Sequence, residues 1–165
     1  MLAVTKIMNI VFKNSSNSTI GVITPYQAQR KFLMQKMNNY NNRLMINTAD
    51  SFQGQEKDII IISTVRSNEK NLIGFLKDDR RTNVALTRAR YLLVVVGNGN
   101  CLSSSGTWQK FIEWNKDKKS YYELNSEMEL DKTLNAIFPI CVWWSLIGDI
   151  ISVENVDYNL NMSTT

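Results

Sequence analysis

The sequence predicts an α/β domain in which a parallel β-sheet is flanked by helices. Short apolar runs alternate along the chain with stretches whose apolar residues recur at helical spacing. The run DIIIIST at residues 58–64 is β-branched and continuously apolar, which is typical of a strand covered on both faces. Strands and helices that alternate in this way favour a parallel sheet with right-handed crossovers.

The first half of the chain predicts two helices and two strands. Residues 2–12 carry apolar side chains near helical spacing, and residues 20–23 form a short buried strand. Pro25 is expected in the first turn of the next helix, with Thr24 as its N-cap. That helix ends in an Asn-rich stretch, after which residues 44–46 can form a second strand.

The second half predicts two more strands and two more helices. The strand at residues 58–64 is followed by a helix over residues 80–90 and by a buried strand, YLLVVVG, at residues 91–97. A last helix, with two tryptophans among its apolar residues, is expected over residues 106–118. These four segments complete the alternation that defines the fold class.

The chain has 165 residues, enough for one domain with a core but not for two ordinary ones. Residues 1–124 hold 18 Lys and Arg against 9 Asp and Glu, a net charge of +9. Residues 125–165 hold one Lys against six acids, a net charge of −5, so we assign them to a separate acidic and apolar extension. A basic body indicates a polyanionic partner, although an ordinary basic surface has the same composition.

Composition also disfavours several classes of function. Cys101 and Cys141 are isolated and the chain has no His, so we expect no metal site. Isolated thiols fit a reducing intracellular compartment, either the cytoplasm or the nucleus. Lys6 interrupts the apolar start, which argues against a signal peptide. The apolar run at residues 136–152 falls short of the roughly 20 residues that cross a bilayer, so we expect no membrane partner.

Three segments contain most of the candidate functional residues. They are GVITPYQAQ at residues 21–29, NTADSFQGQEKDIIIISTVRSN at residues 47–68, and GFLKDDRRTNVALTRARYLLVVVGN at residues 74–98. Each has a structural explanation by itself: a strand end, a surface turn and a solvated Arg-rich helix. Their occurrence together, in this order and spacing, is the specific signal.

ITPYQAQ resembles motif IV of the superfamily 1B helicases, TADSFQGQE resembles motif V, and RRTNVALTRAR resembles motif VI. Within that superfamily the segments resemble the helicases related to the nonsense-mediated decay helicase and senataxin, and VVVGN and WQKFIEW also match them. The resemblance runs to about residue 124. It implies a RecA-like fold of the AAA_12 type, the C-terminal lobe of an ATP-dependent RNA or DNA helicase.

Motif VI of that family carries an arginine finger, which implies a catalytic role for Arg88. An arginine delivered across a cleft can neutralise charge that develops on a γ-phosphate. Arg81 lies seven residues earlier, so we expect both arginines on one face of one helix and add Arg81 to the catalytic set. For Arg80 and Arg90 a structural role and a functional one remain open.

Motif V supplies the predicted nucleotide-binding residues. Gly54 lets the backbone approach a ligand closely. Glu56 matches the family's glutamate that binds the ribose, although capping a helix or turn is the structural alternative. Gln53 and Ser51 are short polar groups suited to coupling the nucleotide and the nucleic acid.

Single-stranded nucleic acid is expected beyond the strand ends. Thr24, Tyr26, Thr48 and Ser51 follow predicted strands, where hydroxyl and backbone N–H groups bind phosphates without reading sequence. Ligands of open α/β sheets gather at the carboxyl ends of strands. Tyr26 has two further alternatives, stacking on a base or simple packing.

The sequence contains no GxxxxGK[ST] loop for the β- and γ-phosphates. Asp50 and Asp58 belong to motif V and do not replace an acidic strand end for magnesium. We therefore expect ATP with Mg²⁺ to be bound mainly by a preceding RecA-like lobe, which makes this chain a fragment or a truncated gene product. The alternatives are a non-catalytic module that binds nucleic acid or a helicase partner, and an inactive copy.

Overall fold

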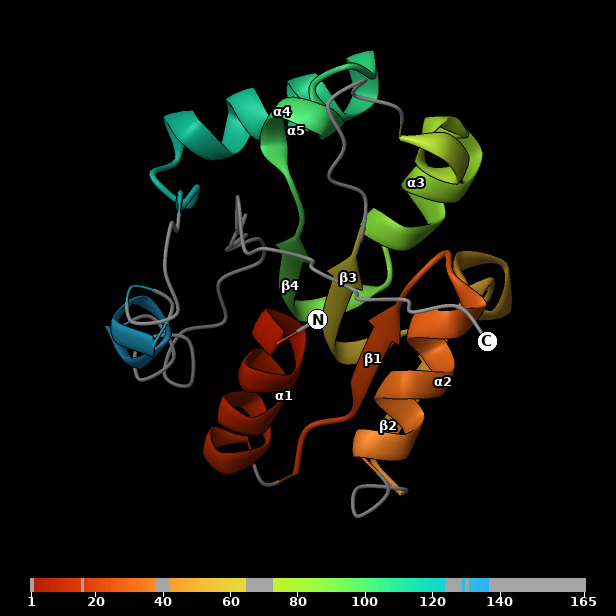
Figure 1. Cartoon of the computed structure of the whole chain (residues 1–165), viewed down its shortest axis with the longest axis vertical. Helices are drawn as coiled ribbons and strands as arrows, with labels where there is room; N and C mark the ends of the chain where they lie inside the picture. Colours follow the sequence, from red (N-terminus) through yellow and green to blue (C-terminus); the bar gives the residue numbers. More distant parts are fainter. Residues whose placement is uncertain are drawn as a thin grey trace, which may run out of the picture.

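A computed structural model describes residues 2–15, 17–37, 42–64, 73–123, 129 and 131–136. Helices and strands alternate through most of this length (Figure 1). The elements are α1 (Leu2–Asn14), β1 (Ile20–Ile23), α2 (Gln27–Lys36), β2 (Leu44–Asn47), η2 (Ala49–Phe52), β3 (Lys57–Ser63), η3 (Gly74–Lys77), α3 (Asp79–Leu86), β4 (Ala89–Val96), α4 (Gly99–Leu102) and α5 (Gly106–Asp117). The two η elements are single 3₁₀ turns.

The four strands form one parallel sheet in the order β2-β1-β3-β4. Ile20 of β1 is aligned with Leu44 of β2 and with Ile59 of β3, and Ile59 is aligned with Leu92 of β4. All the strands therefore start at one edge of the sheet, here called the amino edge, and end at the opposite one, the carboxyl edge. The predicted parallel α/β fold is confirmed, and its RecA-like form agrees with the resemblance.

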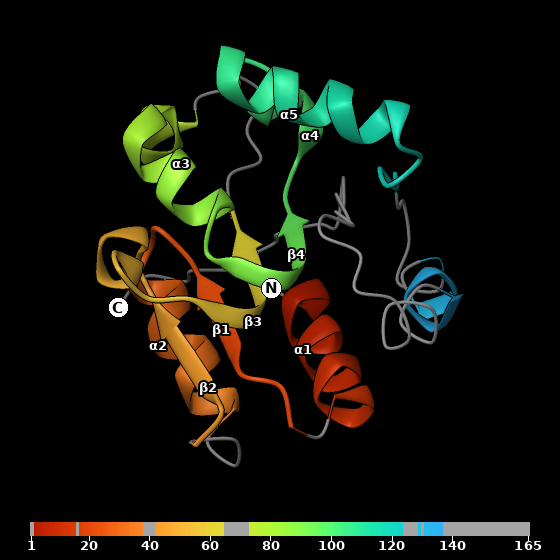
Figure 2. The ribbon, with the colours of Figure 1, turned by 180° about the vertical axis from the view of Figure 1, so that it is seen from behind.

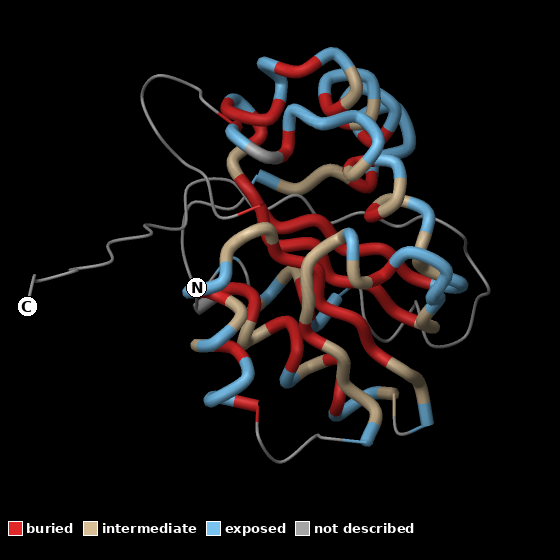
Figure 3. Tube along the Cα trace, turned by 90° about the vertical axis from the view of Figure 1, so that its right-hand side faces the viewer, coloured by how far each residue is buried: buried red, intermediate tan, exposed pale blue. Residues whose placement is uncertain are grey.

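Helices cover both faces of the sheet, with α1 and α2 on one face and α3 and α5 on the other (Figures 1 and 2). Strand β3 shows why its apolar run is uninterrupted. Ile59 and Ile61 point into the core beneath α1 and α2, whereas Ile60 and Ile62 point into the core beneath α3 and α5. Figure 3 shows buried residues along the strands and exposed ones on the outer helices and loops. The run at residues 58–64 is thus buried on both faces, as its composition predicts.

A glycine in β1 allows motif V to lie directly on the sheet. Phe52 of η2 is fully buried, and a Cβ on Gly21 would come within 2.7 Å of its ring and within 2.6 Å of Ile60. Any side chain at this position would push η2 away from the strands, because packed interiors leave no room for an added carbon. Gly21 therefore fixes the height of the motif V turn above β1.

The predicted helix over residues 80–90 is wrong at its carboxyl end. Helix α3 ends at Leu86, where the Thr87 hydroxyl donates to the carbonyl of Asn83 at 2.8 Å. The chain then enters the sheet, since the backbone N–H of Lys57 donates to the carbonyl of Arg88 at 3.1 Å. Strand pairing starts two residues earlier than the sequence pattern indicates, and β4 begins at Ala89.

The predicted start of the second helix also needs correction. Helix α2 begins at Gln27, after Pro25 and after Tyr26, whose backbone is extended. Thr24 is not the N-cap, because its N–H donates to the carbonyl of Asn47 at 3.0 Å and continues the pairing of β1 with β2. Thr24 therefore belongs to the hydrogen-bond ladder of the sheet and not to the helix.

Part of the C-terminal segment packs on the domain. Residues 131–136 are helical, and Leu134 is fully buried in the core beneath α1. Lys6 pairs with Asp131 at 2.9 Å. Most of the predicted extension, including all but the first residue of the apolar run at 136–152, lies outside the described residues. Within the described part, no helix is long and apolar enough to cross a membrane.

Candidate functional sites at the two edges of the sheet

Arg88 lies at the amino edge, in the two-residue link between α3 and β4. Its Nη2 donates to the hydroxyl of the neighbouring Thr87 at 2.9 Å. Its Nε is buried and has no hydrogen-bond partner among the described residues. A buried donor without an acceptor costs free energy comparable to a lost hydrogen bond, so this guanidinium is suited to an acceptor from outside the lobe.

Two carboxylates flank Lys57, whose backbone N–H bonds to Arg88, and a second arginine follows two residues later in β4. Arg90 Nε is 3.3 Å from Glu56 Oε2, and Arg90 Nη1 is 3.7 Å from Asp58 Oδ1. The side chains of Arg90 and Glu56 are each 54% exposed, which leaves the carboxylate of Glu56 accessible to a ligand. Arg90 thus forms an ion pair within this chain, whereas among the described residues the Arg88 side chain bonds only to Thr87.

Asp58 anchors this edge to the start of β1. Its Oδ2 accepts hydrogen bonds from the backbone N–H and the hydroxyl of Thr19, both at 2.8 Å. Burial raises the pKa of Asp58. The hydrogen bonds from Thr19 and the charges of Arg90 and Lys57 lower it by a larger amount, so the pKa lies below the ordinary value. Asp58 is therefore ionised at neutral pH and acts as a structural carboxylate.

The motif V turn leads from the carboxyl edge back to the amino edge. Gly54 has a φ of +74°, a conformation that favours glycine, and a Cβ there would meet open space. No group of the described residues lies close to this position, so the backbone angle explains the glycine. Gln53 ends η2 and is exposed, as is Gln55.

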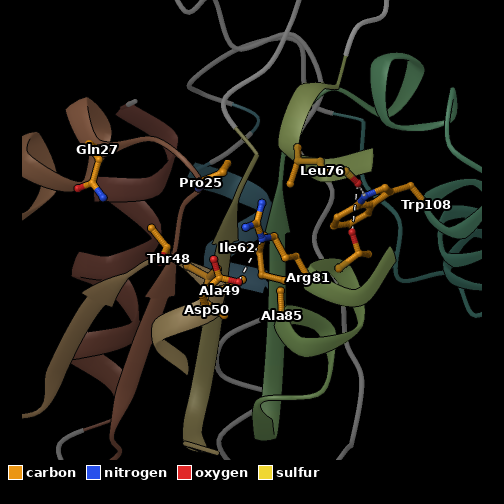
Figure 4. Close-up of a pocket in the computed structure, with 12 residues that line it drawn as sticks. Pro25, Gln27, Thr48, Ala49, Asp50, Ile62, Leu76, Arg81, Ala85 and Trp108 are labelled. Carbon is orange, nitrogen blue, oxygen red and sulfur yellow. Dashed lines mark hydrogen bonds and ion pairs between the residues drawn. The ribbon is translucent and has the colours of Figure 1, made fainter. Parts of the chain in front are cut away.

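A pocket with a volume of about 270 Å³ opens at the carboxyl edge (Figure 4). Segments of all three motifs line it, together with η3 and α5. Its lining combines apolar side chains with hydroxyl, amide and charged groups. The lining residues are Ile23, Pro25, Gln27, Thr48, Ala49, Asp50, Ile62, Leu76, Arg81, Thr82, Ala85 and Trp108.

Arg81 belongs to this pocket and not to the Arg88 site. Its Nε lies 3.1 Å from Asp50 of motif V and 3.9 Å from Asp78, and Figure 4 shows Arg81 and Asp50 pointing toward one another. The expectation that Arg81 and Arg88 share a helix face is wrong, because α3 ends before Arg88. Helix α3 runs from the carboxyl edge toward the amino edge, and its part from Arg81 to Leu86 spans roughly 7.5 Å along the helix axis, so the two arginines lie toward opposite ends of the helix.

The four residues predicted to bind nucleic acid all lie at the carboxyl edge, in different surroundings. Thr48 lines the pocket, and its hydroxyl is 3.3 Å from that of Ser51. Tyr26 is half-buried and stands between Pro25 and Gln27 of the lining. Thr24 is completely buried, with its hydroxyl bonded to Gln29, so it does not offer a hydroxyl to a phosphate in this conformation.

Sequence reasoning missed the contribution of Trp108 to the pocket. Its indole is 1% exposed, and Nε1 donates to the carbonyl of Leu76 at 3.0 Å. The same carbonyl accepts the hydroxyl of Thr82 at 3.1 Å, which ties η3 to both α3 and α5. A tryptophan on an amphipathic helix predicts only core packing, so no local signal indicates this position.

Comparisons with known proteins identify the family of this chain. The chain belongs to the AAA domain family, whose family model matches residues 1–100. It is 48% identical over 111 residues to the Drosophila melanogaster regulator of nonsense transcripts 1 homolog, covering 63% of this chain and 9% of that protein. It is 42% identical over 124 residues to the ATP-dependent helicase upf1 of Schizosaccharomyces pombe, covering 70% and 13% respectively.

The ATP-dependent helicase NAM7 of Saccharomyces cerevisiae is 45% identical over 100 residues, covering 56% of this chain and 10% of that protein. Within its family the chain therefore resembles the C-terminal lobe of the superfamily 1B helicases, and in particular the nonsense-mediated decay helicase. The chain spans only 9% to 13% of the length of these three relatives.

Proposed function

We propose that this chain is the C-terminal lobe of an ATP-dependent RNA or DNA helicase. In this proposal the amino edge faces a nucleotide held by a first RecA-like lobe, and the carboxyl edge contacts single-stranded nucleic acid. The observation that carries the proposal is Arg88, whose buried Nε lacks a partner among the described residues. Two of the three relatives named above are described as ATP-dependent helicases, which supports the nucleotide.

Arg88 acts as the arginine finger in this proposal. Its planar guanidinium stabilises negative charge that develops during phosphoryl transfer, and a group fixed in advance does so without reorganisation. Arg88 is a better candidate than Arg81 or Arg90, since both of those are already paired with carboxylates of this lobe.

Glu56 binds the ribose in this proposal. The Glu56 side chain is half exposed and its carboxylate is paired with Arg90. A carboxylate accepts hydrogen bonds from hydroxyl groups such as those of a ribose. Gly54 and Gln53 form the exposed turn next to it. ATP supplies the free energy of hydrolysis, and we propose that ATP and Mg²⁺ are held mainly by the first lobe.

The pocket and the strand ends form the nucleic-acid surface in this proposal. Thr48, Ser51 and Tyr26 offer hydroxyl and backbone groups, and Arg81 adds a positive charge at the rim. Groups of this kind bind phosphates without reading base sequence. The basic body of residues 1–124 supports a polyanionic ligand.

A two-lobe reconstruction tests the proposal. A RecA-like lobe with an intact P-loop is joined before Met1, and phosphate release is measured with and without single-stranded RNA or DNA. We expect turnover from the joined protein, stimulated by the single strand, and none from the chain alone. Binding of the strand without any turnover in the joined protein would favour a non-catalytic binding module.

A further inference from the structure

Three buried polar side chains form a continuous hydrogen-bonded chain at the carboxyl edge. The Thr24 hydroxyl donates to Gln29 Oε1, and Gln29 Nε2 donates to Ser63 Oγ at 2.6 Å. Thr24 Oγ1 also accepts the backbone N–H of Tyr26 at 3.4 Å. Thr24 and Ser63 are fully buried and Gln29 is 5% exposed, so this hydrogen-bond network lies inside the molecule.

The hydrogen-bond network joins elements that are far apart in sequence. Gln29 lies on α2, Thr24 follows β1, and Ser63 ends β3. The N–H of Thr24 bonds to the carbonyl of Asn47 at the end of β2. Thr64, the next residue after Ser63, donates its hydroxyl to the carbonyl of Val96 at the end of β4, at 3.2 Å.

Such a network needs an explanation other than bulk stability. Burying an amide and two hydroxyls costs free energy that their mutual hydrogen bonds only offset, whereas apolar side chains would fill the same space without that cost. What the network adds is direction, because the amide must turn its oxygen to Thr24 and its nitrogen to Ser63 at the same time. One side chain thereby ties helix α2 to the residue that follows β1 and to the last residue of β3.

We propose that Gln29 is a positioning residue that holds the segment Thr24–Tyr26 at the rim of the pocket. The proposal rests on the proposed function, since the segment it positions is part of the nucleic-acid surface. Gln29 itself does not line the pocket and acts through Thr24 and Ser63. Pro25 of this segment and Gln27, which follows it, line the pocket, so movement of the segment changes the shape of the pocket.

Amide hydrogen exchange of the full chain tests the positioning directly. Gln29→Met keeps the length of the side chain without its polar atoms, and Ser63→Ala removes the acceptor if the first variant folds poorly. We expect exchange of the Thr24 and Tyr26 amides to accelerate about two- to tenfold, the value of one hydrogen bond. Leu33→Val, a buried change one turn further along α2, is the control that loosens packing and leaves the chain of hydrogen bonds intact.

Unchanged exchange at Thr24 and Tyr26, or a rise equal to that of Leu33→Val, would overturn the proposal. The combined variant of Gln29 and Ser63 should be no worse than the more affected single one, because both changes break the same connection. Additive effects would instead indicate two independent packing defects.

Oligonucleotide titration separates this inference from the proposed function. We expect Gln29→Met to weaken binding of a labelled single strand about two- to tenfold at one salt concentration, and Leu33→Val to leave it near the wild-type value. Equal losses of affinity in both variants would mean that Gln29 contributes only to core packing, as Leu33 does. If the wild-type chain binds no strand at all, the nucleic-acid part of the proposed function fails, and the exchange rates alone decide whether Gln29 positions the segment.

Discussion

The two edges of the sheet differ in how their polar groups are satisfied. At the carboxyl edge, Thr24, Gln29 and Ser63 are buried and linked by hydrogen bonds, and Pro25 and Gln27 of the same segment line the pocket. At the amino edge, Glu56 and Arg90 are half exposed, and Arg88 keeps a buried donor without a partner among the described residues.

This difference suggests two kinds of work. A satisfied buried network binds no ligand itself but fixes the geometry around it, so it suits the positioning of exposed groups that contact a strand's backbone. An unsatisfied guanidinium beside accessible carboxylates gains free energy only when an external acceptor arrives, which suits a charge that appears in a transition state. This comparison supports the proposal that the chemistry takes place at the amino edge and that the strand binds at the carboxyl edge.

The largest expected effect separates the two edges by turnover. In the joined two-lobe protein, Arg88→Ala should lower kcat by roughly 10³- to 10⁵-fold, as loss of an arginine finger does. Arg88→Lys should not restore it, because an ammonium lacks the planar fork. Phosphate release at saturating ATP is the measurement.

Two controls accompany the Arg88 variants. Arg81→Ala should mainly raise the strand concentration needed for half-maximal stimulation, and Lys13→Ala on the exposed end of α1 should change nothing. If Arg88→Ala raises KM alone and leaves kcat intact, Arg88 is a binding or surface residue and the comparison between the edges collapses.

A second prediction concerns salt and the carboxyl edge. If the chain neutralises about three phosphates of a single strand, log affinity should fall with log salt at a slope near −2, which is roughly twentyfold weaker binding between 50 and 200 mM. Arg81→Gln should reduce the slope by about 0.7, and the similarly exposed Arg90→Gln at the amino edge should not. Fluorescence titration of one labelled oligonucleotide measures both. A flat response to salt rejects electrostatic binding altogether.

A third prediction tests Glu56 at the amino edge. Glu56→Ala should weaken nucleotide binding to the joined protein roughly ten- to hundredfold, the value of a lost hydrogen bond to a charged acceptor, with a smaller effect on kcat. Arg90→Ala is the matched control, because it breaks the same ion pair and leaves the carboxylate in place. Calorimetric titration should show the loss in the first variant and not in the second. Equal losses would mean that the ion pair, and not the carboxylate, matters.

The smallest expected effect is the acid sensitivity that Asp58 confers. Because its pKa is lower in the folded chain than in the unfolded one, its ionisation stabilises the fold fully above the unfolded pKa of about 3.9 and loses that contribution as pH falls through the folded pKa. Asp58→Asn should reduce the free energy of unfolding by about 1 kcal/mol at pH 7, and the gap to wild type should narrow below pH 4. Urea unfolding at several pH values measures the gap. A gap that is constant with pH would assign the loss to hydrogen-bond geometry alone.

Local patterns in the sequence determined the fold class and the position of every strand to within two residues. A β-branched run such as residues 58–64 carries its own information, because both faces of the strand need apolar neighbours wherever the rest of the chain goes. The three motif segments and the family resemblance were likewise contained in the sequence.

Tertiary structure decided which residues share a site. Pairing of Lys57 with Arg88 ends α3 and moves Arg88 to the amino edge, and the ion pair with Asp50 holds Arg81 at the other edge. Pairing of Thr24 with Asn47 turns a predicted helix cap into a buried connector. In each case the deciding partner lies more than 20 residues away, and the hydrogen-bonding groups of a backbone or a guanidinium leave no mark in the sequence of where their partners will be.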